Sequence, residues 1–302
     1  MSNYTFPTQE KFFEGGEILE VIKKRGTKAA ITDFSILLGG RVDSDSDYWH
    51  IDMDDSLAGR TGFYWTKTNS GDYYAHAVSV SGNGSVPNVM RRDSGARPAL
   101  PFSSIDKIHT NGVSGKLEND RDGVKYVYYG YYPQTAASKS MQLELELQFE
   151  NDKLKSTHNG YTTDSRKYDE YDEKFKAQRH EEYEYKGKRY IRVKANSCFD
   201  GNYFKLSNGK SYRNGDYVWV EVEPIKWLVS ERDRLMLADK VVFAGVQFKH
   251  GGDYHTKDFE KTDIKKFIDD CWSKDIEQVR SKRKNYGNWY WGKNWRRTNT
   301  KN

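Results

Sequence analysis

The spacing of apolar positions predicts two short helices near the start of the chain. In residues 17–25 and 32–38, apolar side chains recur at helical spacing. Each run ends at glycine, Gly26 in the first, and glycine is favoured just beyond a helix because it tolerates positive φ. Thr32 precedes the second run and is suited to cap it.

A third helix is predicted over residues 262–277. Its apolar residues recur at intervals of three and four, which places them on one face: Ile264, Phe267, Ile268, Cys271, Trp272 and Ile276. Thr262 can cap this helix, and Asp263 suits the positive end of its dipole. The pattern puts Cys271 on the buried face.

Alternation and turn residues predict strands over most of the remaining chain. The ranges are 63–68, 73–80, 86–90, 124–135, 141–150 and 217–229, while 235–243 is a buried strand or a short connection. In 141–150, MQLELELQFE, the leucines and Phe149 alternate with Gln and Glu, which predicts a half-buried strand. Pro224 marks an edge or a bulge, because proline lacks a backbone N–H.

Two hairpins are predicted, over 183–193 with its turn at Lys186-Gly187, and over 203–212 with its turn at Asn208-Gly209. Few helices and many short strands indicate an α+β fold class that is β-rich, with short antiparallel strands. The polar, glycine-rich residues 106–123 are typical of a link between domains.

This link divides the chain into an N-terminal unit (1–115), a second β-rich unit (124–279) closed by the third helix, and a tail (280–302). Eight of the 49 lysines and arginines and none of the 44 acids lie in the tail. Residues 1–279 therefore carry a net charge of −3, so an argument for nucleic-acid binding from basic charge applies to the tail alone.

The tail combines basic and aromatic residues, which are Lys282, Arg283, Lys284, Tyr286, Trp289, Tyr290, Trp291, Lys293, Trp295, Arg296 and Arg297. Basic groups neutralise phosphates while aromatic rings stack on unpaired bases, so the pattern suits single-stranded RNA or DNA. It equally suits an anchor for a protein partner, where Trp, Tyr and Arg dominate. A third interpretation is a terminal strand folded back on the body.

The cysteines and the N-terminus indicate a cytoplasmic protein. Cys198 and Cys271 form no CxxC motif and are too few for a secreted disulfide scaffold. The first residues lack the basic and apolar regions of a signal peptide, and no run approaches the ~20 apolar residues of a membrane span. We expect no membrane partner.

Two groups of motifs resemble a known fold. The segments "TGFYWTK…YYAHAVSVSGNG…SGARPALPF" resemble the closing part of domains with the formylglycine-generating-enzyme-like, C-type-lectin-type fold. The segments "GYYPQT…VEVEPIKWLVSERDRLMLADKVVFAGVQF" resemble the opening part of related, uncharacterised bacterial domains. The closing-type element (63–102) precedes the opening-type element (126–248), as in a circular permutation or in two partial domains in tandem. The link favours two units.

The resemblance implies a buried, structural Arg97 that bonds carboxylates or backbone carbonyls. The candidate carboxylates are Asp93 and the group Asp52, Asp54 and Asp55. The oxidase of this fold uses two cysteines near the end of its domain, whereas the matching range 60–102 contains none. The resemblance therefore implies the architecture without the catalysis, and we expect no enzyme and no cofactor.

Two segments are candidates for metal binding. Asp43, Asp45 and Asp47 begin like a Ca²⁺ loop, but Tyr48 and Asp54 replace the glycine and glutamate that such a loop needs, so a solvated acidic loop is the alternative. In KHGGDYH the candidates are His250, Asp253 and His255, where two glycines indicate a floppy loop instead.

These features favour a non-enzymatic binding protein that recognises a macromolecule, chiefly a protein. The recognition residues would be the tail and a set of aromatic loops: Tyr48, Trp49, Tyr64, Trp65, Tyr73 and Tyr74. One alternative is an accessory subunit or inhibitor in a nucleoprotein complex, with RNA or DNA on the tail. The other is a metal-dependent enzyme.

The nucleic-acid interpretation of the tail is testable by fluorescence anisotropy with a labelled single strand. We expect the affinity to fall steeply with salt, because binding releases counterions. Changing Trp289, Trp291 and Trp295 together to alanine should remove binding, since each stacked base contributes about 1–3 kcal/mol. An affinity that does not change with salt would contradict this interpretation.

Overall fold

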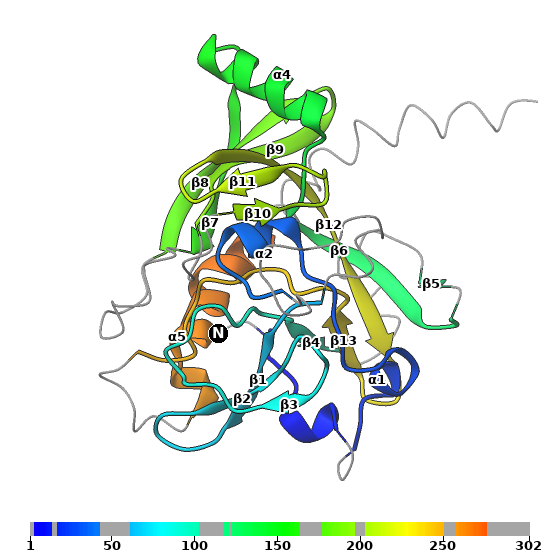
Figure 1. The fold of residues 1–302 in the computed structure, drawn as a ribbon. Helices are drawn as coiled ribbons and strands as arrows, with labels where there is room; N and C mark the ends of the chain where they lie inside the picture. The colour runs from blue at the N-terminus through cyan, green and yellow to red at the C-terminus, as the bar shows by residue number, and fades with distance from the viewer. Residues whose placement is uncertain are drawn as a thin grey trace, which may run out of the picture.

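The computed structural model describes residues 3–13, 17–42, 61–102, 117–120, 122–163, 177–196, 203–250 and 258–276. Over these ranges the fold is α+β and β-rich, with antiparallel sheets and few helices, as the sequence predicts (Figure 1). Among the described residues, no helix combines the length and the apolar composition needed to cross a membrane.

Both short helices predicted near the N-terminus are present. After the turn η1 (Gln9–Lys11), helix α1 (Glu20–Arg25) ends at Gly26, whose φ is 77°. Helix α2 (Asp33–Leu37) begins after Thr32, whose side chain accepts a hydrogen bond from a backbone N–H of the first turn. The predicted cap and glycine stop are confirmed.

A small antiparallel sheet contains β1 (Tyr64–Asn69), β2 (Ala75–Val78) and β3 (Gly84–Ser85), in this order. The strand predicted at 63–68 is confirmed with a shift of one residue, and the strand predicted at 73–80 is confirmed over its four central residues. The strand predicted at 86–90 is wrong. There the Asn88 side chain accepts a hydrogen bond from the Met90 backbone N–H, which favours a turn over a strand.

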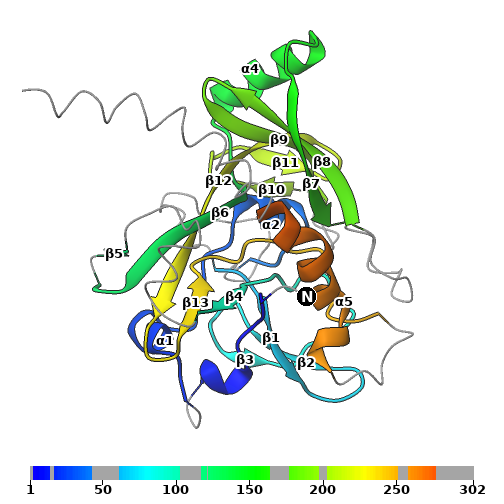
Figure 2. The same cartoon turned by 180° about the vertical axis from the view of Figure 1, so that it is seen from behind.

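Strand β12 (Tyr217–Ser230) organises the main sheet. One edge of β12 pairs with β6 (Lys125–Ala136). The other edge pairs first with β9 (Lys188–Lys194) and then with β13 (Leu235–Ala238). Figures 1 and 2 show β6 and β12 in the middle of the molecule, between the end that carries α4 and the end that carries β1 to β3.

One end of the sheet continues through β9 to β8 (Ala177–Tyr185) and β7 (Ser156–Thr163), with α4 (Lys139–Glu150) lying above (Figure 1). The hairpin between β8 and β9 turns at Lys186-Gly187, as predicted, with φ angles of 50° and 76°. The second predicted hairpin is also present, as β10 (Tyr203–Lys205) and β11 (Ser211–Arg213).

The other end of the sheet includes β4 (Ala99–Pro101), which pairs with β13, and β5 (Glu118–Asn119), which pairs with β6. Strand β4 belongs to the closing-type element and β13 to the opening-type element. The predicted link at 106–123 therefore does not coincide with a break in this sheet.

The predicted C-terminal helix is present. It starts after the turn η4 (Phe259–Lys261) as α5 (Asp263–Phe267), continues through the π-helical segment η5 (Ile268–Trp272), and extends to residue 276. Thr262 caps it. All six residues of the predicted apolar face are buried, Cys271 among them.

Trp272 is the centre of the main hydrophobic cluster. Its ring lies 4.9 Å from that of Tyr4, 5.8 Å from Phe243, 6.1 Å from Tyr132 and 6.3 Å from Trp227, measured between centroids. These rings come from the N-terminal segment, from β6 and β12, and from the chain after β13. One aromatic cluster thus joins residues from both sides of the predicted link.

Arg97 is buried, with 2% of its surface exposed. Its Nε donates to the backbone carbonyl of Ala238 at 2.9 Å, and its Nη1 donates to the Tyr64 hydroxyl at 3.2 Å. Asp93 accepts from Arg91 instead, so the expectation that Asp93 pairs with Arg97 is wrong. The expectation of a backbone-carbonyl partner is confirmed; Asp52, Asp54 and Asp55 lie outside the described residues.

We expect Arg97→Met to destabilise the fold by about 2–4 kcal/mol, because it leaves the buried Ala238 carbonyl and Tyr64 hydroxyl without their donor. Chemical denaturation measures the free energy of unfolding. The exposed Lys67→Met variant is the control and should change it by less than about 0.5 kcal/mol. Equal stability of the two variants would contradict a structural role for Arg97.

Candidate functional site

Residues 139–150 form helix α4, so the strand predicted over 141–150 is wrong. The Ser138 hydroxyl caps the helix by accepting a hydrogen bond from the Met141 backbone N–H at 3.3 Å. None of the twelve residues is β-branched, and most are strong helix formers. The Leu-Glu alternation arises because this helix carries apolar side chains on two faces.

The inner face of α4 is held firmly on the sheet. Leu145 and Phe149 pack in a small second hydrophobic cluster around Trp219. The Gln142 side chain donates to the Trp219 backbone carbonyl at 2.7 Å and accepts from the Trp219 backbone N–H at 2.8 Å. The Trp219 indole N–H donates to the Glu146 carboxylate at 2.7 Å. These bonds fix the rotation of the helix about its axis.

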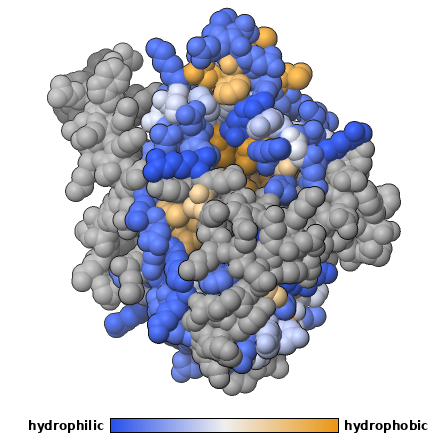
Figure 3. Space-filling model, turned by 90° about the vertical axis from the view of Figure 1, so that its left-hand side faces the viewer, coloured by the Kyte–Doolittle hydropathy of each residue, from blue (hydrophilic) through white to orange (hydrophobic). Residues whose placement is uncertain are grey.

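The outer face of α4 exposes two leucines one helical turn apart. Leu143 is 72% exposed and Leu147 is 56% exposed, whereas Leu145 between them is fully buried. Residues spaced i and i+4 are neighbours on a helix surface. Figure 3 shows hydrophobic atoms at the upper end of the molecule, where α4 lies, bordered by hydrophilic ones. We refer to Leu143 and Leu147 as the α4 leucine pair.

Acidic residues border this pair. Glu144 accepts hydrogen bonds from Lys186 at 2.8 Å and from Tyr185 at 2.7 Å, which together lower its pKa. The pKa of Glu146 is also lowered, chiefly by the hydrogen bonds from Arg192. Both carboxylates are therefore ionised at neutral pH, and α4 carries three glutamates against one lysine.

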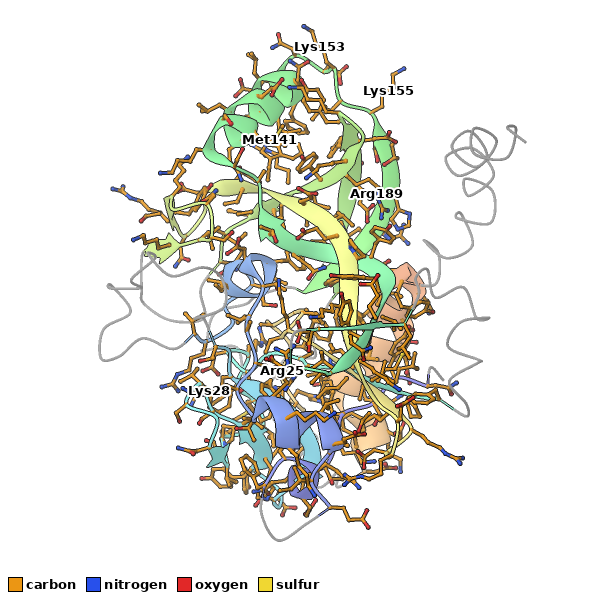
Figure 4. The ribbon with its side chains drawn as sticks, turned by 90° about the vertical axis from the view of Figure 1, so that its right-hand side faces the viewer. Arg25, Lys28, Met141, Lys153, Lys155 and Arg189 are labelled. Atoms are coloured by element: carbon orange, nitrogen blue, oxygen red, sulfur yellow. The ribbon has the colours of Figure 1, made fainter. Side chains whose placement is uncertain are left out.

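The cations at this end of the molecule lie beside α4. Figure 4 shows Met141 on the helix, Lys153 and Lys155 beyond its C-terminal end, and Arg189 on β9; Arg25 and Lys28 lie at the opposite end of the molecule. The Arg189 guanidinium pairs with Glu182 and lies 4.7 Å from the centroid of the Tyr131 ring. Lys186 and Arg192 pair with Glu144 and Glu146 directly beside the helix, so charges of both signs surround the leucine pair.

The predicted aromatic loops divide into buried and exposed members. Tyr73 and Tyr74 are about half exposed, at 51% and 50%. Tyr64 and Trp65 are fully buried, so their assignment as recognition residues is wrong. Both lie in β1, where successive residues point to opposite faces, and each face packs against neighbouring segments. Tyr48 and Trp49 lie outside the described residues.

The predicted tail site, residues 280–302, lies entirely outside the described residues, as do the calcium candidates Asp43, Asp45 and Asp47. Asp253 and His255 also lie outside. Within the described ranges, no three or more His, Cys, Asp or Glu side chains are grouped so as to hold a metal ion. The tail and the calcium site remain predictions.

His250 belongs to a buried polar network at the start of α5. Its Nδ1 lies 3.0 Å from a carboxylate oxygen of Asp263. That carboxylate also accepts from the Gln247 amide at 2.9 Å, and the Gln247 oxygen accepts from Arg92 at 3.1 Å. This chain of contacts ties the segment before the helix to its first turn, which is a structural role.

A second buried polar group lies where β7 and β8 meet the end of the C-terminal helix. His180 packs directly over Gly160: a Cβ at that position would lie 2.4 Å from His180 Nε2 and 3.1 Å from an Asp275 carboxylate oxygen. Neither ring nitrogen of His180 has a hydrogen-bond partner among the described residues. Burial, together with nearby His158, lowers its pKa to about 3.

Cys271 lies in the same region as a free, buried thiol. Burial, helped by the charges of Asp270 and Asp275, raises its pKa to about 11. Because the thiolate is the nucleophilic form of cysteine, this residue is inert at neutral pH. Cys198 lies outside the described residues.

Comparison of the chain with protein-family models, with curated proteins and with solved structures gives no match.

Because the pKa of His180 is lowered, we expect the protein to lose stability in mild acid. Because its folded pKa lies below the usual value near 6.5, the unfolded chain binds the proton first, and stability falls as the pH drops from about 6.5 towards 3. Between pH 7.5 and 5.0 we expect this residue alone to contribute a loss of about 2 kcal/mol.

The measurement is urea denaturation of the wild type and His180→Leu at both pH values. The variant should lose less stability on acidification than the wild type, whatever its stability at pH 7.5. Identical losses for the two proteins would show that His180 is protonated in the folded state as readily as in the unfolded chain.

Proposed function

We propose that the protein is a non-enzymatic binding protein and that it docks a protein partner through the outer face of α4. The observation that carries this proposal is the α4 leucine pair, two large apolar side chains exposed on a helix whose inner face is fully engaged. An amphipathic helix that inserts i and i+4 side chains into a groove is a recurring mode of protein recognition.

The partner that suits this face has an apolar groove that accepts two leucines one helical turn apart. Covering the two leucines would stabilise the complex by about 1–2 kcal/mol each, given the surface that they expose. Glu144 and Glu146 already pair with Lys186 and Arg192, so apolar contact with the two leucines, and not charge, would select the partner.

The exposed Tyr73 and Tyr74, near Val86, offer a second recognition surface in keeping with the aromatic-loop prediction. The tail is a third, and there the choice between a protein and a nucleic acid stays open. We rank α4 first because its leucines sit on a rigid helix, and a preformed surface loses less conformational entropy on binding.

We also infer that the protein has a lectin-type, formylglycine-enzyme-like framework in which the closing-type and opening-type elements form one permuted unit. The pairing of β4 with β13 and the Arg97 bond to Ala238 support this, because each joins one element to the other. A framework of this kind carries recognition loops on a rigid core. No reaction enters this proposal.

The docking proposal is tested with a photoreactive residue at position 143, which identifies the partner by cross-linking in the native host. Binding is then measured by calorimetry with the purified partner. Leu143→Ala with Leu147→Ala should weaken binding at least about tenfold while leaving the helix intact, since alanine is the best helix former.

The control is Lys23→Ala, at an exposed position of helix α1 outside both surfaces, which should bind like the wild type. A normal affinity for the leucine double variant, with binding lost in Tyr73→Ala/Tyr74→Ala, would move the interface to the β1–β3 sheet. Sedimentation analysis of the purified chain tests the remaining alternative. If the wild type is a dimer and the leucine double variant is a monomer, a second copy of the chain covers the leucines, and the proposal is overturned.

A further inference from the structure

A cavity of about 260 Å³ opens where β6 and β12 pair, on a part of the molecule that does not include α4. Its walls come from three sequence motifs that are far apart in the chain. YYPQT supplies Gln134, EPIKW supplies the run from Glu223 to Lys226, and LADKVVF supplies Asp239 and Lys240. These motifs carry the resemblance to uncharacterised domains, and here they meet around one space.

The backbone opens at this point because the pairing of β6 with β12 is interrupted twice. The register shifts between Glu221 and Val222, and again between Pro224 and Lys226. Proline cannot donate a ladder hydrogen bond, which explains the second interruption and confirms the predicted bulge. Bulges are common beside binding sites, because they redirect side chains out of the regular ladder.

Gln134 holds the bulge in a fixed shape. Its side-chain amide donates to the backbone carbonyls of Glu223 at 3.1 Å and of Pro224 at 3.0 Å. The two carbonyls that the irregular pairing would leave without donors are thereby satisfied. The wall of the cavity is thus preformed.

Two of the four charged side chains around the cavity are already engaged with each other. The Lys226 ammonium lies 3.8 Å from the Asp239 carboxylate and 4.3 Å from the centroid of the Tyr126 ring. Glu223 and Lys240 remain. Within the described part of the chain, neither the Glu223 carboxylate nor the Lys240 ammonium forms an ion pair or a side-chain hydrogen bond, with each other or elsewhere.

The site therefore offers one open anion and one open cation. A singly charged ligand would satisfy one of them and displace water from the other without compensation, which costs free energy. A molecule that carries an ammonium and a carboxylate compensates both. The half-exposed Tyr128 ring supplies an apolar wall to this cavity of about 260 Å³. A free amino acid fits this space, while a long peptide does not.

We propose that this cavity binds a free α-amino acid, whose ammonium group pairs with Glu223 and whose carboxylate pairs with Lys240. The site is independent of the docking face on α4. It gives the protein a small-molecule ligand in addition to a macromolecular partner.

The test is calorimetry of the full chain with each of the twenty free L-amino acids at millimolar concentration, and with glucose as a neutral polar probe. At least one amino acid should bind with one-to-one stoichiometry, and glucose should not. The N-acetyl and the C-terminal amide derivatives of the best ligand each lack one charge, and each should bind at least about tenfold more weakly.

Two variants assign the charges to residues. Glu223→Gln should lower the affinity for the free amino acid at least about tenfold, and the N-acetyl derivative should then bind as well as the free amino acid. Lys240→Met should lower the affinity equally, and the C-terminal amide should then bind as well as the free amino acid. Glu184→Gln, at an exposed position of β8 outside the cavity, is the control and should bind normally. Absence of binding by all twenty amino acids, or equal affinities for the free and derivatised ligands, would overturn the proposal.

Discussion

Strand β12 is engaged along both edges, and the arrangement of the molecule depends on this. One edge pairs with β6, while the other is shared between β9 near its start and β13 near its end. Because β9 and β13 pair with different parts of the same edge, the sheet extends from β12 in two directions. One direction leads through β8 and β7 to α4, and the other leads through β13 to β4 and the buried Arg97.

The long pair of β6 and β12 departs from regular strand geometry at Gly130 and at two interruptions of its register. At Gly130, in β6, φ is 68°, and a Cβ there would lie 2.3 Å from a methyl carbon of Ile276 in the last helix. Glycine is therefore required both for the backbone angle and for the approach of the helix. The register shifts beside Gln134 and Pro224 lie in the same part of the strand pair, and both residues line the cavity. This irregular part of the pair thus contacts the last helix and borders the proposed ligand site.

Local signals in the sequence predict much of this fold. The caps at Thr32 and Thr262, the turn at Lys186-Gly187 and the apolar face of the last helix are confirmed because each depends on neighbouring residues alone. The strand prediction for residues 141–150 is wrong because the alternating leucines lie on opposite faces of a helix, one buried and two exposed. The cap at Ser138 and the lack of β-branched residues were the signals for a helix. The cavity was not predictable, because its three motifs meet only through the strand pairing.

The α4 leucine pair has no evident role in holding the chain together. The helix is fixed from below by Gln142, Leu145 and Glu146, so the outer positions are free to carry any good helix former. A glutamate and a lysine there would add an i,i+4 pair worth about 0.2–0.5 kcal/mol and keep the surface soluble. Leucine at these positions forms no such ion pair and exposes apolar area to water. This arrangement stabilises a complex if another apolar surface covers the leucines. Since the inner-face bonds prevent the helix from rotating to bury these side chains, the proposed partner would supply their cover.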